Sequence, residues 1–204
     1  MRDNQLPTSE QIHRSHYYHS FFRGYTEAKV PSADGKRIRI KRVYTEDYIV
    51  CDQPKFMEVL SRILNFFLLI PGVYLFMAAG KVNANYNKTP VIALFSMIYA
   101  VMLILTFGVM LMYTIRPIKM TEYDYKSTSE RLIRFSFICG IIGAVIFICT
   151  FLGAWYYGTS LDSITAGYLF SAILIALCGL FEKKRGYKTV ENTNIPPEEG
   201  NIIL

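Results

Sequence analysis

Three histidines near the start of the chain have the spacing that best fits metal chemistry. His13, His16 and His19 recur at every third residue. On a helix they would share one face, where imidazole nitrogens can bind a transition metal. They stand in a polar stretch without a Cys or carboxylate cluster beside them, so a solvated tail is the simpler interpretation. The sequence predicts no metal site and no cofactor.

A second set of ionisable residues borders the apolar parts of the chain. Glu58 and Arg62 are four residues apart, in the order that favours an ion pair along a helix. Arg134 stands at the start of another apolar run, on the same predicted side of the membrane. We predict that Glu58 pairs with Arg62 or with Arg134 at the inner boundary. The alternative is that each side chain extends to the lipid headgroups independently.

The centres of the four apolar runs contain no Asp, Glu, Lys, Arg or His. Ion-coupled carriers usually hold such a group inside the membrane, so coupled transport by this chain alone is disfavoured. All three histidines precede residue 20, which also disfavours intramembrane Ser/His chemistry. A membrane enzyme would need a site of Tyr, Ser, Asp and Glu at the inner boundary, and no spacing here supports one. We therefore predict no catalytic residues.

The apolar runs themselves indicate a membrane protein. Hydrophobic residues make up 52% of the 204 residues and charged residues 19%, against about 25% charged in an ordinary soluble protein. About 20 apolar residues in a helix cross a hydrocarbon core of roughly 30 Å. The expected fold is an all-α membrane protein, a four-transmembrane-helix bundle with a small N-terminal cytoplasmic β-hairpin. The predicted spans are 63–80, 90–115, 132–157 and 164–181.

The placement of Lys and Arg predicts the orientation of these spans. Of the 22 basic residues, only Lys81 and Lys88 fall in the two loops on one side, and the other 20 flank the opposite ends of the spans. Cytoplasmic loops keep the positive charge. We therefore expect a multi-pass protein of the cell membrane with both termini cytoplasmic. Membrane orientation and contact with anionic lipids explain the net charge of +6 more simply than nucleic-acid binding does.

The segments outside the spans have different predicted characters. Residues 1–15 form a disordered tail, 16–56 a hairpin region, 57–182 the transmembrane domain and 183–204 a flexible cytoplasmic tail. Asp34-Gly35 between two β-type runs signals a hairpin. The alternation in 37–41 places Ile38 and Ile40 on one face of its second strand. A lone hairpin is marginal in water, so it must pack on its own protein, on the membrane surface or on a partner.

Small residues and one proline are the main features inside the spans. A seam along span four is formed by Gly167, Ser171, Leu174 and Cys178, and we expect it to meet the glycines of span three within the chain. A dimer interface on the same seam is the alternative. Pro71 lies in the middle of span one and predicts a kink. Its functional alternative is a substrate site at a broken helix.

Three related motifs stand outside the spans. They read Arg23-Gly-Tyr-Thr-Glu27, Arg42-Val-Tyr-Thr-Glu-Asp-Tyr48 and Lys119-Met-Thr-Glu-Tyr-Asp-Tyr-Lys126. With these motifs the chain resembles uncharacterised small four-span membrane proteins of Gram-positive bacteria, over most of its length. That resemblance brings no known activity and implies only a bacterial plasma membrane.

Two functions follow as expectations. The first is a non-catalytic subunit or adaptor of a membrane complex, which docks a protein partner or a further copy through the cytoplasmic N-terminal region. The second is a small carrier or channel formed by oligomerised four-span units. Membrane lipids are expected partners in either case, and nucleic acid is not.

Overall fold

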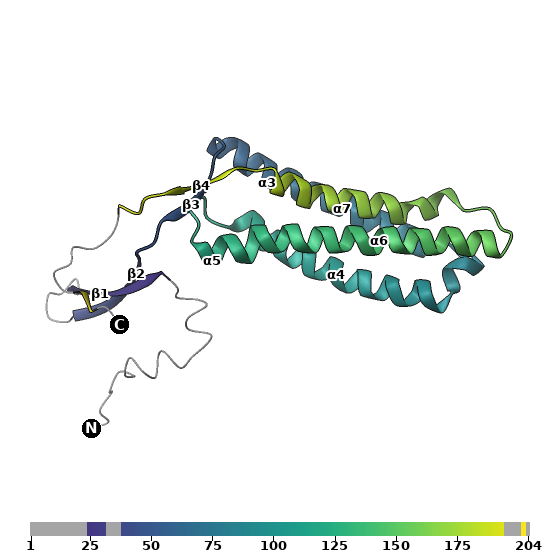
Figure 1. The fold of residues 1–204 in the computed structure, drawn as a ribbon, viewed down its shortest axis with the longest axis horizontal. Helices are drawn as coiled ribbons and strands as arrows, with labels where there is room; N and C mark the ends of the chain where they lie inside the picture. The colour runs from purple at the N-terminus through teal and green to yellow at the C-terminus, as the bar shows by residue number, and fades with distance from the viewer. Residues whose placement is uncertain (1–23, 32–37, 194–200, 203–204) are drawn as a thin grey trace, which may run out of the picture. The chain divides into compact units, whose positions relative to one another are not determined.

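Four long helices dominate the computed structural model, which describes residues 24–31, 38–193 and 201–202 (Figure 1). The chain divides into two units. One unit contains the helices and comprises 51–118 and 124–187. The other contains most of the strand residues and comprises the described parts of 1–50, 119–123 and 188–204.

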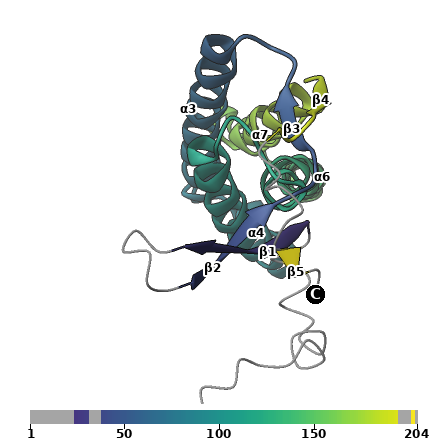
Figure 2. The ribbon, with the colours of Figure 1, turned by 90° about the vertical axis from the view of Figure 1, so that its left-hand side faces the viewer.

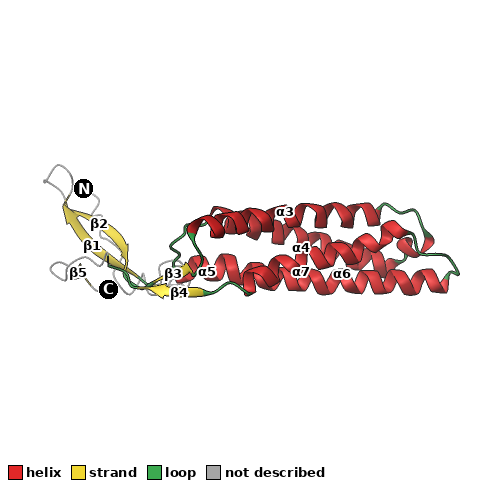
Figure 3. Ribbon diagram, turned by 90° about the horizontal axis from the view of Figure 1, so that it is seen from above, coloured by secondary structure: helices red, strands yellow, loops and turns green. Residues whose placement is uncertain are grey.

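The helical unit confirms four helices long and apolar enough to cross a membrane. Their bounds are α3 Lys55–Gly80, α4 Pro90–Ile115, α6 Arg131–Tyr156 and α7 Gly167–Lys183. Short turns precede three of them, namely η1 Asn85–Lys88, η3 Ser163–Ala166, and α5 Glu122–Tyr125 with the π-helical turn η2 Lys126–Glu130. Figure 3 shows the four long helices running side by side. Only α3 differs clearly from its prediction, because it begins at Lys55 rather than at 63.

Prolines mark several of these helix ends. Pro54 directly precedes α3, and Pro90 is the first residue of α4. Proline suits these places because its fixed φ fits the first turn and the helix needs no amide hydrogen there. Pro117 ends α4, since the residue before a proline is driven into extended backbone. Arg116 has that conformation, with φ −59° and ψ 151°.

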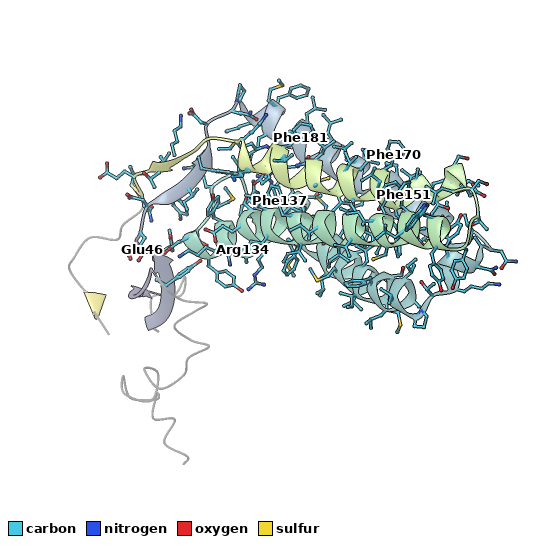
Figure 4. All side chains as sticks on the ribbon, turned by 45° about the vertical axis from the view of Figure 1, so that its right-hand side comes forward. Glu46, Arg134, Phe137, Phe151, Phe170 and Phe181 are labelled. Atoms are coloured by element: carbon cyan, nitrogen blue, oxygen red, sulfur yellow. The ribbon has the colours of Figure 1, made fainter. Side chains whose placement is uncertain are left out.

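The outer surface of the helices is apolar. Ile104 is 71% exposed and Phe67 61%, and other large apolar side chains lie exposed along every long helix. Among those labelled in Figure 4, Phe151, Phe170 and Phe181 belong to this surface. Soluble proteins rarely expose contiguous apolar patches larger than a few hundred Å². The outside of this bundle therefore has the chemistry of a lipid-facing surface.

The interior of the bundle is built by a ring of four helices. α7 packs against both α3 and α6, and α4 packs against α6 and α3. Figure 2 views the unit toward one end of the helices. Leu69, Tyr99, Ile146 and Ile175, one from each helix, are almost fully buried in the core.

The small residues of the spans are used inside the chain. A Cβ added at Gly143 of α6 would lie 2.7 Å from the Cβ of Ala172 in α7. The seam of span four faces a different neighbour than expected, because a Cβ at Gly167 would lie 2.7 Å from the carbonyl oxygen of Leu75 in α3. The seam therefore packs within the chain, but against α3 rather than against the glycines of span three as predicted. The glycines of α6 meet the alanine face of α7, and the Gly167 face meets α3.

The predicted hairpin is present in the second unit. Strands β1 Tyr25–Pro31 and β2 Ile38–Tyr44 pair antiparallel, and β5 Asn201–Ile202 pairs with β1. Ile38 lies opposite Pro31 and Ile40 opposite Lys29. The turn at 32–37 and the side chains of Ile38 and Ile40 lie outside what the structure describes. So do residues 1–23, including the predicted tail 1–15 and the three histidines.

The C-terminal segment differs from its prediction. A flexible tail was expected over 183–204, but Tyr187–Val190 form strand β4, which pairs with β3 Tyr48–Cys51. Beyond it, the buried Asn192 donates to the carbonyl oxygen of Tyr44 at 2.5 Å. A four-residue strand is too short to show a period, so the sequence pattern did not reveal it.

Candidate functional site

A buried carboxylate at the end of α7 organises the most polar part of the bundle. Glu182 is 1% exposed and forms ion pairs with Arg116 at 3.5 Å and with Arg185 at 3.3 Å. The hydroxyl of Tyr113 donates to Glu182 Oε2 at 2.5 Å, and that of Tyr187 donates to Oε1. These five residues are called the Glu182 cluster below.

Two helix ends supply this cluster. Tyr113 and Arg116 are three residues apart at the end of α4, and Glu182 and Arg185 are three apart at the end of α7. Residues at this spacing share one face of a helix. Tyr187 follows in β4. The cluster thus joins α4, α7 and the chain that leaves α7.

The turn before α6 supplies further hydrogen-bond acceptors to Arg116. The Arg116 guanidinium donates to Thr128 Oγ1 at 3.3 Å and to Ser129 Oγ. Both hydroxyl residues are buried in the π-helical turn η2. Such turns are rare and are frequent at functional sites. Arg116 Nη2 also donates to the Tyr187 hydroxyl at 2.8 Å, so one guanidinium ties three segments together.

The environment shifts the pKa values of two residues of the Glu182 cluster that lie outside the long helices. Burial, followed by the charge of Glu182, raises the pKa of Tyr187 to about 12, so the phenol keeps the proton that it donates. For Arg116, burial acts to lower the pKa, but Tyr187 and Glu182 act in the other direction and the pKa is raised overall. Both groups therefore hold the protonation states that the hydrogen bonds require.

The sequence-predicted pair of Glu58 and Arg62 forms beside this cluster. Both side chains are buried and the two are ion-paired. Arg62 Nη1 also donates to the carbonyl oxygen of Arg116 at 2.6 Å, and Nη2 lies 3.5 Å from that of Pro117. A cation that binds the last carbonyls of a helix opposes the negative end of the helix dipole. Arg62 therefore connects α3 to the end of α4.

The other predicted residues of the helical unit stand apart. Arg134 pairs with Glu130 at 3.0 Å rather than with Glu58, and its side chain is 72% exposed (Figure 4). Pro71 lies on the exposed side of α3, which continues through it from Lys55 to Gly80. Neither belongs to the buried polar site.

No protein-family model, curated protein or solved structure matches this chain. The resemblance to Gram-positive four-span proteins therefore stays a prediction. Within the described residues, no group of three or more His, Cys, Asp or Glu could hold a metal ion. The functional interpretation has to come from the geometry of the site itself.

Sequence reasoning missed the whole Glu182 cluster. A signal for it was present, because Glu182 is the first residue after the predicted span 164–181 and Arg116 the first after 90–115. Both positions fall on the same predicted side of the membrane. Opposite charges at the ends of two spans on one side could have been read as a candidate pair.

The arrangement of the Glu182 cluster suits it to hold the helix ends together. The Glu182 carboxylate is flanked by two guanidinium groups and receives two phenol hydrogen bonds. Both carboxylate oxygens are thus already engaged by protein partners. The chemistry of the cluster is that of a tie between helix ends.

Proposed function

We propose that this chain is a multi-pass protein of the cell membrane and serves as a non-catalytic subunit or adaptor of a membrane complex. Its four helices anchor it, and both termini lie on the cytoplasmic side. The observation that carries the proposal is that the buried Arg and Glu side chains of the bundle gather at one end and pair with one another.

The surface of the bundle supports anchoring. Large apolar side chains face outward along all four helices, as a lipid environment requires. Trp155 and Tyr156, 79% and 81% exposed at the end of α6, suit the opposite membrane interface, where amphipathic rings prefer to lie. The basic residues flank the other end, which fits the cytoplasmic side.

Partner docking is assigned to the N-terminal strands. β2 carries Arg39, Lys41 and Arg42 and no acidic residue. Charged groups of one sign steer a partner of the opposite charge and suppress pairing between two like strands. An acidic surface on another subunit is therefore the partner that these strands fit.

Crosslinking in native membranes followed by mass spectrometry tests this proposal. The Arg39→Glu/Lys41→Glu variant should lose crosslinks to the partner, whereas Lys81→Glu/Lys88→Glu, in the loop between α3 and α4, should keep them. If the wild-type chain crosslinks only within itself, the adaptor proposal is wrong. If the two variants retain equal partner yields, the strands are not the docking surface.

A carrier or channel is the second candidate. Three buried polar contacts between elements of the bundle favour it. The contacts are Tyr86–Thr165 at 3.2 Å, Tyr99–Ser171 at 2.9 Å and Thr106–Cys139 at 3.4 Å. They join η1 to η3, α4 to α7 and α4 to α6, respectively. Solute flux into vesicles that contain the purified oligomer tests this candidate. Absence of flux for every solute class from a verified oligomer would exclude it.

A further inference from the structure

The buried charges at this end of the bundle do not balance. Three Arg and two Glu side chains of the helical unit are buried there, namely Arg62, Arg116, Arg185, Glu58 and Glu182. Each Glu has an Arg partner, and one positive charge remains in excess. Arginine stays protonated in proteins. An uncompensated buried charge is costly, so such a site gains stability from a counter-ion.

Several hydrogen-bond donors in the same region have no protein partner. They are Arg62 Nε, Asn65 Nδ2, Arg116 Nε and Ser136 Oγ. Each of these residues is more than nine-tenths buried. The three nitrogen groups can only donate, and the hydroxyl can donate as well. A buried polar group without a partner costs free energy, so these atoms are suited to a ligand that accepts hydrogen bonds.

Two of the residues that carry these donors, Asn65 and Ser136, contact adjacent residues of α7. Asn65 follows Arg62 by three residues on α3, and its carbonyl oxygen accepts from Cys178 Sγ at 3.5 Å. Ser136 approaches from α6, where a Cβ added at Gly179 would lie 2.8 Å from the Ser136 Cβ. Cys178 precedes Glu182 by about one helical turn.

The excess charge and the donors are connected at the end of α4. Arg62 binds the carbonyl oxygen of Arg116 at 2.6 Å. This contact brings the α3 residues together with the guanidinium that faces Glu182. The partnerless donors and the positive charge therefore belong to residues of α3, α6 and the end of α4 that lie at the same end of the bundle.

From these contacts we propose that this end of the bundle binds a monovalent anion, held by Arg62, Arg116, Asn65 and Ser136. One negative charge balances the excess, and its lone pairs accept from the donors. Hydrogen bonds between a charged donor and an anion are about twice as strong as neutral ones. A water molecule would satisfy donors without balancing the charge.

The anion has two possible sources with the same chemistry. A small inorganic ion such as chloride comes from solution, and the headgroup of a net-anionic phospholipid such as phosphatidylglycerol comes from the bilayer. Both carry one negative charge and accept hydrogen bonds. The side chains of Arg116 and Arg185 are only 1% and 4% exposed, so an anion bound beside them would be largely shielded from water.

Thermal unfolding of the purified full chain tests the proposal. In uncharged detergent, sodium chloride is compared with sodium gluconate at equal ionic strength. In lipid nanodiscs in gluconate, phosphatidylcholine alone is compared with a mixture containing phosphatidylglycerol. A ligand at 100 times its Kd should raise the midpoint temperature by roughly 5–10 °C. A rise with chloride identifies a solution anion, and a rise only with phosphatidylglycerol identifies a lipid headgroup.

Variants show whether the response comes from this site. Asn65→Leu/Ser136→Ala should lose most of the anion-dependent rise. Ser96→Ala is the matched control, because it also removes a buried hydroxyl but lies in the first turns of α4. It should keep the full rise. If the double variant does not fold, Ser136→Ala alone should weaken anion binding several-fold.

Two results would overturn the proposal. One is an equal midpoint temperature in both salts together with an equal midpoint in both lipid compositions. The other is a response that is as large in folded Asn65→Leu/Ser136→Ala or Ser136→Ala as in the wild type. The adaptor proposal is tested separately by crosslinking, so either can fail alone.

Discussion

The two ends of the helical bundle satisfy their polar groups in different ways. At the end where α7 stops, ionised side chains of Arg and Glu form the Glu182 cluster and the Glu58–Arg62 pair. At the other end, Tyr86 shares a hydrogen bond with Thr165 at 3.2 Å and accepts one from the amide of Asp162 at 3.2 Å. Only neutral groups take part in these contacts.

This difference determines how much stability each end should lose when one of its polar side chains is replaced. A neutral hydrogen bond contributes about 1 kcal/mol net, and its loss leaves at most a modest penalty. A buried ion pair adds little over an apolar packing, yet removing one partner leaves a charge without compensation and is strongly destabilising. The charged end should therefore be the vulnerable one, and the predictions below test this from the largest expected effect to the smallest.

Replacing Glu182 should have the largest effect. Glu182→Leu removes the carboxylate shared by Arg116 and Arg185 and leaves both guanidinium groups buried without their ion-pair partner. We expect a loss of about 3–5 kcal/mol in the free energy of unfolding, measured by denaturation in mixed micelles.

Glu130→Gln is the matched control for this change. Its partner Arg134 has a side chain that is 72% exposed, and exposed pairs contribute at most about 1 kcal/mol. If Glu182→Leu is no more destabilising than Glu130→Gln, the charged end does not depend on its ion pairs.

The middle of the bundle, between the two ends, should respond to volume rather than charge. Gly143→Ala places a Cβ 2.7 Å from the Ala172 Cβ, so one of the helices must shift. We expect a loss of about 1–3 kcal/mol in the same measurement. At Gly108 nothing lies within 4 Å of an added Cβ. Gly108→Ala should therefore be neutral or slightly stabilising, and equal losses for the two variants would contradict the packing described for α6 and α7.

Tyr86→Phe tests the neutral end. It removes the hydroxyl that joins Thr165 and the Asp162 amide, so about 1 kcal/mol should be lost. The measurement is the same denaturation, with Glu182→Leu as the reference. A loss as large as that of Glu182→Leu would show that the two ends are equally sensitive.

The pH dependence should be the smallest effect and belongs to the charged end. The pKa of Tyr187 is raised from 10.0 to about 12 in the folded protein, so the folded state holds this proton more tightly than the unfolded state. Its contribution to stability is fully present below pH 10 and is lost as pH rises through the folded pKa. The free energy of unfolding should fall less between about pH 9 and pH 11 in Tyr187→Phe than in the wild type. Identical slopes would contradict the burial of this phenol.

The sequence predicted the elements better than the contacts between them. The span 90–115 coincides with α4, because Pro90 begins the helix and Pro117 ends it. Glu58 and Arg62 could be paired because four residues along one helix is a local relation. Helix-end prolines and i, i+4 spacing are both visible without a structure.

The sequence alone could not predict contacts between residues that are far apart in the chain. Arg116 and Glu182 end helices that are far apart in the chain, and no periodicity connects them. Arg134 looked as suitable as Arg62 for Glu58, and only the arrangement of the helices shows that it faces outward to Glu130. The strand at Tyr187–Val190 forms because it pairs with β3. A segment of four residues is too short for its sequence to predict that pairing.

Labelling with a membrane-impermeant maleimide tests the central claim most directly, namely that four helices cross a membrane with the charged end inside. Lys88→Cys and Lys184→Cys place thiols at exposed positions at opposite ends of the bundle, and the unsubstituted chain gives the background from its four native cysteines. In intact cells, Lys88→Cys should be labelled and Lys184→Cys should be labelled only after permeabilisation. Labelling of Lys184→Cys in intact cells would contradict the claim.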